Sequence, residues 1–151
     1  MKFFAAIVLS FLLVAANIVL IQCQEEDIMA TKKEAFSQCS IEHNISKEAV
    51  HSIMNHENVP NDSEVKCWLG CVFKKLGVLK KGNIDWERCI MLTKHCLSND
   101  QDKAKVDEIA NICRAEVPKD EKDECELAYS VAVCKINNWN NLGLPISDGN
   151  E

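Results

Sequence analysis

The segment Cys67-Trp68-Leu69-Gly70-Cys71-Val72-Phe73-Lys74-Lys75-Leu76-Gly77 decides the fold of this 151-residue chain. Its apolar residues keep the three-and-four spacing of an amphipathic helix, which we expect over residues 62–76. Cys67 and Cys71 are four residues apart, so they share one helix face and lie about 6 Å apart along the axis. Gly77 suits the C-terminal stop of this helix. One helix could therefore be stapled to two different neighbours.

Four further cysteines extend this pattern along the chain. In the order Cys39, Cys67, Cys71, Cys113, Cys125 and Cys134, the cysteines are separated by 27, 3, 41, 11 and 8 residues. Cys125 and Cys134 are about two and a half helical turns apart, so they point to opposite sides of a helix and suit two separate partners. The residues alone leave 15 pairings open for six cysteines.

The rest of the chain also reads as short amphipathic helices, without the alternation of apolar and polar residues that marks strands. Ser46 and Asp85 are good N-caps, and we expect a turn over residues 79–83. The polar run 98–102 should break the chain between two helices. The expected fold is all-α, with six short helices over residues 25–39, from Ser46 onward, 62–76, 86–97, 103–115 and 121–138, and an extended tail over 139–151.

The N-terminus predicts a secretory signal peptide over residues 1–23, followed by one domain over 24–151. Lys2 precedes 19 residues without a charge, Phe3 to Ile21. Cleavage after Ala16 and a retained membrane anchor are the alternatives. Cleavage after Cys23 leaves eight cysteines in 128 residues, an even number that suits a disulfide framework in an oxidising compartment. We therefore expect a secreted, extracellular protein.

The formal charge of −6 comes with scattered lysine pairs and no basic stripe, so we expect no nucleic-acid partner. The chain has no GxSxG, HExxH or phosphate-loop motif, and cysteines committed to disulfides are not nucleophiles. We therefore expect no enzyme and no catalytic residue. Zinc sites usually show paired CxxC or HxxxH spacing, so Cys89, His95 and Cys96 are not expected to hold a metal, and no cofactor is expected.

The cysteine spacing resembles that of the six-cysteine insect odorant-binding protein family, which includes the pheromone-binding proteins. The runs 67–77 and Cys125-Glu126-Leu127-Ala128-Tyr129 also resemble this family, and the likeness covers essentially all of residues 24–151. The resemblance implies six helices around a buried apolar cavity. It also implies three interlocked disulfides: Cys39–Cys71, Cys67–Cys125 and Cys113–Cys134. Such cross-links would offset the packing lost in a hollow core.

Cys89 and Cys96 are additional to this six-cysteine pattern. They are seven residues apart, which is roughly 10 Å along the axis of a continuous helix and too far for a disulfide. Either the helix breaks before Cys96 and the two cysteines form a bridge, or both are buried thiols, or they pair elsewhere.

The family likeness also suggests which residues contact a ligand. Residues of the tail would form a lid, and Tyr129 could offer its hydroxyl either to a ligand oxygen or to the backbone. The candidate ligand-binding residues are Met54, Val72, Phe73, Leu76, Ile84, Met91, Ile109, Ile112, Tyr129, Val133 and Trp139, with Leu142, Leu144 and Ile146 in the lid.

The resemblance implies a secreted carrier that reversibly binds small hydrophobic molecules such as odorants or pheromones. One alternative is a non-olfactory extracellular carrier or scavenger of hydrophobic compounds, and another is a disulfide-stapled secreted protein acting on a protein partner. A membrane receptor is a further candidate partner, and we expect a monomer or a weak homodimer. Asn44 and Asn61 begin glycosylation sequons, and four histidines offer a hypothesis of pH-dependent ligand release.

Overall fold

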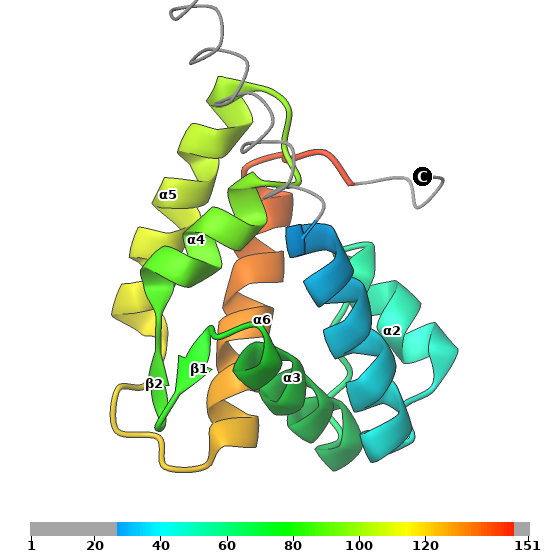
Figure 1. Ribbon diagram of the computed structural model, residues 1–151. Coiled ribbons are helices and arrows are strands. Elements are labelled where there is room, and N and C mark those ends of the chain that lie inside the picture. The colour runs from blue at the N-terminus through cyan, green and yellow to red at the C-terminus, as the bar shows by residue number, and fades with distance from the viewer. Residues whose placement is uncertain (1–26, 147–151) are drawn as a thin grey trace, which may run out of the picture. The chain divides into compact units, whose positions relative to one another are not determined.

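The computed structural model describes residues 27–146, and the expected signal peptide lies outside this range. The chain divides into two compact units, one ending at Lys33 and the other beginning at Glu34. Of the first unit only residues 27–33 are described, and they are helical. The second unit contains the features described below, and Figure 1 shows its labelled elements.

Six helices cover most of the described range, which confirms the all-α prediction. The first runs over residues 27–43 and is four residues longer at its C-terminal end than expected. The others are α2 (Lys47–Met54), α3 (Ser63–Lys75), α4 (Trp86–Lys94), α5 (Asp100–Glu116) and α6 (Glu124–Asn141). None of the described helices is long and apolar enough to cross a membrane.

Side-chain caps explain where these helices begin. The Ser46 hydroxyl accepts a hydrogen bond from the Ala49 amide at 3.1 Å, and Asp62 and Asp85 cap α3 and α4 in the same way. Asn99 accepts a hydrogen bond from the Asp102 amide at 2.8 Å. The polar run 98–102 is therefore partly the first turn of α5, and the expected start at residue 103 is wrong.

Two helix ends also differ from expectation. Helix α4 ends at Lys94, before the expected residue 97, so Cys96 lies beyond it. Helix α6 continues to Asn141, so Trp139 is helical and the extended tail predicted from residue 139 is wrong at its start. No glycine or proline interrupts α6 until Gly143, whose φ of 61° gives the left-handed stop.

A short hairpin between α3 and α4 corrects the expectation that the chain has no sheet. Strands β1 (Leu79–Lys80) and β2 (Asn83–Ile84) are antiparallel, with Leu79 opposite Ile84. Lys81 and Gly82 have φ values of 50° and 72°, the two positive values that a tight type I′ turn requires. The Gly82 amide donates to Glu124 Oε1 at 2.9 Å, which fixes the hairpin to the start of α6.

Three disulfides join the helices in the pairing that the family resemblance implied. Cys39–Cys71 joins the first helix to α3, Cys67–Cys125 joins α3 to α6, and Cys113–Cys134 joins α5 to α6. Their cysteines are separated by 32, 58 and 21 residues. In the chain-entropy model, loops of these sizes correspond to about 3–4 kcal/mol of stabilisation for each bridge.

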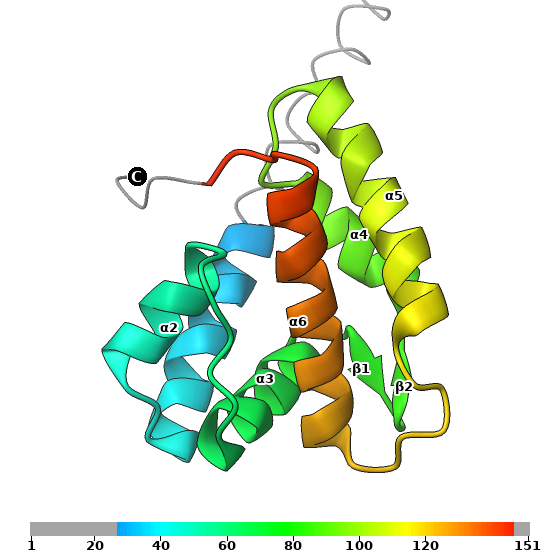
Figure 2. The same ribbon diagram turned by 180° about the vertical axis from the view of Figure 1, so that it is seen from behind.

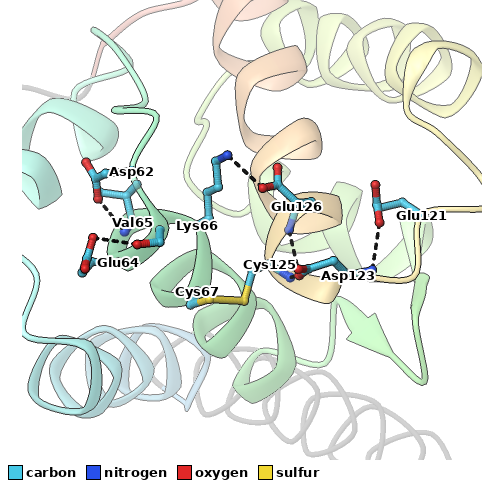
Figure 3. Close-up of polar contacts among 10 residues, drawn as sticks. Asp62, Glu64, Val65, Lys66, Cys67, Glu121, Asp123, Cys125 and Glu126 are labelled. Carbon is cyan, nitrogen blue, oxygen red and sulfur yellow. Dashed lines mark hydrogen bonds and ion pairs between the residues drawn. A yellow bond between two sulfur atoms is a disulfide. The ribbon is translucent and has the colours of Figure 1, made fainter.

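Among α2 to α6 and the two strands, α3 and α6 make the most extensive contact. Figure 3 shows the Cys67–Cys125 bridge beside the ion pair of Lys66 and Glu126, whose Nζ and Oε1 atoms are 2.9 Å apart. The Cα atoms of the two cysteines are only 4.4 Å apart. Gly70 lies one turn further along, where a Cβ atom would be 3.4 Å from the Glu124 carbonyl oxygen. Gly70 therefore lets the two backbones approach closely.

The first helix from Glu34 onward also packs against α3. Phe36 stacks on Trp68 with ring centroids 5.7 Å apart, and the fully buried Trp68 donates its indole N–H to Ser40 Oγ at 3.1 Å. Cys39 is equally buried beside them. The two cysteines on one face of α3 therefore hold two different neighbours, as their spacing predicts.

We predict that a larger side chain at Gly70 separates α3 from α6. Gly70→Val should lower the free energy of unfolding by about 1–3 kcal/mol, because its methyl groups would overpack the backbone of α6. Gly70→Ala is the matched control and should change stability by less than about 1 kcal/mol, since better helix propensity offsets its close contact. Urea denaturation of the oxidised proteins measures both values. If the Gly70→Val protein were as stable as the parent, the close approach would be contradicted.

Candidate functional site

A small cavity lies among α4, α5 and α6. Figure 2 shows these three helices from behind. Each helix contributes one face, with residues spaced three or four apart. The walls are formed by Trp86, Cys89, Ile90 and Thr93 from α4, by Val106, Ile109, Ala110 and Cys113 from α5, and by Val131, Lys135 and Trp139 from α6. The amphipathic faces of the three helices thus close around a mostly apolar space.

The cavity volume is about 20 Å³. That is room for roughly one water molecule, and less than an odorant-sized molecule requires. The walls from α5 and α6 are largely buried, whereas Trp86, Cys89 and Ile90 on α4 are half-buried. Any larger occupant would therefore have to displace side chains, and α4 is the wall nearest to solvent.

Three groups add polarity to this cavity. The Thr93 hydroxyl donates to the Cys89 carbonyl at 2.9 Å, one turn earlier in α4. Burial raises the pKa of the Cys89 thiol, so the reactive thiolate form is disfavoured. Lys135 contributes an ammonium group, whose nitrogen is 5.7 Å from the centroid of the Trp139 ring.

Neither of the two additional cysteines forms a disulfide. Cys89 lies in the cavity wall, and Cys96 is exposed after the end of α4, where its sulfur contacts the Leu92 carbonyl at 3.8 Å. Within residues 27–146, the one cluster with metal-ligand spacing contains Cys39, Glu42 and Cys71. Its two sulfur atoms are joined in a disulfide, so they are not thiolate ligands.

The structure brings some of the predicted ligand-binding residues together. Ile109 and Trp139 line the cavity, and Phe73, Ile84, Leu142 and Leu144 pack in the same hydrophobic core. Val72 is buried on α3 and Leu76 at its C-cap, and neither lines the cavity. Leu144 is the buried member of the predicted lid, and the Trp139 indole N–H donates to the Pro145 carbonyl at 3.2 Å.

Other predicted residues lie elsewhere. Ile112, Tyr129 and Val133 are half-buried and do not line the cavity, and the Tyr129 ring lies 5.0 Å from the Lys66 nitrogen. Met54, Met91 and Ile146 are exposed by 44%, 38% and 49%, so the structure does not place them in the cavity. They fall on the outer faces of short helices or in the tail, which apolar character alone does not reveal.

Sequence reasoning expected Met91 on α4 and missed the face of this helix that does line the cavity, and it also missed the lining residues Val106, Ala110, Cys113, Val131 and Lys135. Trp86, Cys89, Ile90 and Thr93 share one helix face, so their periodicity could have indicated this wall. Lys135 and Thr93 were not expected in an apolar cavity. The sequence marked His56 only as one of four histidines, and its long-range contact with Trp139 of α6 was not expected.

His56 covers one side of Trp139. The two rings stack with centroids 4.3 Å apart and an interplanar angle of 8°, and Asn140 donates to the His56 carbonyl at 2.9 Å. The His56 Nδ1 atom is buried and has no hydrogen-bond partner among the described residues. Burial, helped by the nearby Lys135 charge, lowers the pKa of His56 from 6.5 to about 4. The ring is therefore neutral at pH 7.

Comparison with known proteins agrees with this arrangement. Three disulfides that join the helices place the fold in a class of small all-α, disulfide-linked proteins. The model of the PBP/GOBP family matches residues 22–138, so the chain belongs to this family, that of the insect odorant-binding proteins.

Several similar proteins and structures are odorant-binding proteins by name. General odorant-binding protein 19d of Drosophila melanogaster is 28% identical over 118 residues, which cover 76% of each chain. General odorant-binding protein 57e of the same organism is 32% identical over 101 residues, covering 66% of this chain and 69% of that one. The structure of Drosophila melanogaster dmelOBP28a superposes with a TM-score of 0.64 at 25% identity, covering 80% of this chain and 99% of that one. Apis mellifera odorant binding protein 5 gives a TM-score of 0.62 at 22% identity, covering 74% of this chain and 88% of that one.

We predict that His56 makes the fold less stable in acid. Because its folded pKa is below that of the unfolded chain, the unfolded state binds the proton first as the pH falls from 6.5 to about 4. The parent should lose about 1–2 kcal/mol more stability over this window than His56→Asn, after a discount for partial exposure. Asparagine tolerates the positive φ of position 56.

Denaturation series at several pH values measure this difference. The matched control is His51→Asn, which removes an exposed histidine on α2 and should keep the pH slope of the parent. Equal slopes for the parent and His56→Asn would contradict the account of a buried neutral ring.

Proposed function

We propose that this protein is a secreted carrier that reversibly binds small hydrophobic molecules such as odorants or pheromones in the cavity among α4, α5 and α6. The observation that carries this proposal is the apolar cavity with walls from three helices, two of them joined by a disulfide. Family membership and the names of the similar proteins support it. The disulfides and the N-terminal pattern support an extracellular location.

The physical basis of binding is burial of apolar surface, which contributes roughly 25 cal/mol for each Å² removed from water. An affinity of order micromolar, about −8 kcal/mol, would suit carriage followed by release. Since the resting cavity is small, binding includes an outward movement of the half-buried side chains of α4. The disulfides of α6 lie on its contacts with α3 and α5, so they leave α4 without a covalent constraint.

We infer that the protein acts by binding and not by catalysis. The Cys89 thiol has a raised pKa, and the Thr93 hydroxyl donates its proton to a backbone carbonyl. Neither group is poised as a nucleophile. We keep a membrane receptor as a proposed partner, and we propose a monomer or a weak homodimer.

We predict that a larger side chain in the cavity weakens binding. Native mass spectrometry of the oxidised parent with an apolar ester such as decyl acetate should show one ligand per chain. Ala110→Leu should reduce the affinity about 10-fold, because its side chain occupies the space among the three helices. Ala104→Leu is the matched control on α5, where the alanine is exposed, and it should bind like the parent.

Binding measurements on the parent protein alone can contradict the carrier function. No binding of any apolar compound by protein with three intact disulfides would overturn the carrier function. It would favour instead a secreted protein that acts through its surface on a protein partner. Equal affinities of the parent and Ala110→Leu would place the ligand outside this cavity.

A further inference from the structure

Two tripeptides of this chain match the acceptor motif for N-linked glycosylation, Asn-x-Ser with no proline at the middle position. They begin at Asn44 and Asn61, and both lie between Cys39 and Cys71 of the first disulfide. The sequence alone does not separate them, because asparagine, aspartate and serine also begin or end helices for purely local reasons. The structure shows which of the two motifs has such a local role.

The fold accounts for both polar residues of the motif at Asn44. Asn44 directly follows the first helix with a φ of 48°, a left-handed conformation that asparagine adopts more readily than most residues. Ser46 is the N-cap of α2, where its hydroxyl accepts a hydrogen bond from the Ala49 amide at 3.1 Å. A helix end and a helix start thus favour these residue types here, with or without a glycan.

The fold gives no such role to Asn61 or Ser63. The side chain that caps α3 is Asp62, whose carboxylate accepts a hydrogen bond from the Val65 amide at 2.9 Å (Figure 3). The Ser63 hydroxyl donates to the carboxylate of its exposed neighbour Glu64 at 3.0 Å. Among the described residues, Asn61 has a negative φ and its side chain makes no hydrogen bond. Neither packing nor capping therefore explains an asparagine and a serine at this spacing.

The segment around Asn61 can also accommodate a glycan. Residues 61–64 are exposed, whereas Val59 and Val65 on either side are buried and hold the segment in place. Asn61 precedes the first turn of α3, so a sugar on its exposed side chain would not displace a helix. Among the described residues, those that line the cavity come from α4, α5 and α6, so the attachment point is not part of the cavity.

We propose that Asn61 carries an N-linked glycan on the secreted protein. The new bond joins the side-chain amide nitrogen of Asn61 to the anomeric carbon of a sugar supplied by a lipid-linked oligosaccharide. The amide loses one proton, and the lipid pyrophosphate is the leaving group. The Ser63 hydroxyl is the second element of the acceptor motif. This inference rests on the proposed secretion and not on ligand binding, and a bulky, hydrated glycan would add to the solubility of the chain.

The test is to express the full chain in insect cells and to digest the secreted protein with trypsin after reduction and alkylation. Cleavage after Lys47 separates the two motifs, because Asn44 lies before it and Asn61 after it. Mass spectrometry should find the Asn61 peptide with the added mass of a glycan. Peptide-N-glycosidase A in ¹⁸O-labelled water should convert Asn61 to an ¹⁸O-labelled aspartate, and a mock digest without this enzyme should not.

Substitutions at the third position of the motif separate glycosylation from folding. Ser63→Ala should lose the glycan and Ser63→Thr should keep it, because only threonine retains the hydroxyl. Neither change removes the cap of α3, which is Asp62. Asn61→Gln should also lose the glycan. Asn44→Gly is the matched control, because glycine tolerates the positive φ of position 44, and the glycan on Asn61 should remain.

Secreted parent protein whose Asn61 peptide carries no sugar would overturn this inference and leave the carrier function untouched. A labelled aspartate at position 61 that persists in folded Ser63→Ala would overturn it as well. Retention of the chain inside the cells, without any glycan, would instead remove the proposed secretion together with this inference.

Discussion

The close contact of α3 with α6 is the constraint on which the rest of the structure depends. Gly70 leaves no side chain between the two backbones, and the Cys67–Cys125 bridge holds Cα atoms 4.4 Å apart. Cys71 of α3 then forms a disulfide with the first helix, and Cys134 of α6 forms one with α5. Because α6 is joined by disulfides to both α3 and α5, its inner face, with Val131, Lys135 and Trp139, is held in position. The site is thus a consequence of where α6 is held.

The energetics give the disulfides a different role from the one expected from a hollow core. At about 24 cal/mol per Å³, a cavity of about 20 Å³ costs only about 0.5 kcal/mol, far less than the loop closures contribute. The resting protein therefore does not need three bridges to offset its cavity. Under the carrier function that we propose, the bridges would instead hold α3, α5 and α6 together, and α4, which has no disulfide, would supply the movement that a ligand requires. Two cavity walls joined by a disulfide and a third wall without one suit the reversible binding that we propose.

The sequence predicted the fold well where signals are local or covalent. Cysteine spacing indicated the frame, and Ser46 and Asp85 marked helix starts through the side-chain oxygens that cap them. It failed at the two short strands that flank the expected turn over residues 79–83, and where the deciding contact is distant. The hairpin depends on two positive φ values at Lys81 and Gly82, and Trp139 was placed in a tail although its ring is buried against His56. An apolar cavity between helices was predicted. Apolar character could not, however, distinguish Ile109, which lines the cavity, from Met91, which is exposed. The polar groups of the cavity wall were not predicted, because a lysine such as Lys135 is expected on the surface of a protein.

The most direct test of this account is to locate a bound ligand by NMR, using protein with ¹³C-labelled methyl groups and three intact disulfides. Addition of one equivalent of an apolar ligand should shift the methyl signals of Val106, Ile109, Ile90 and Val131, which belong to the three walls of the cavity. The exposed methyl groups of Ile41 and Met54 should stay unchanged. Shifts confined to the exposed methyl groups, with the cavity signals unmoved, would contradict the claim that these three helices form the binding site.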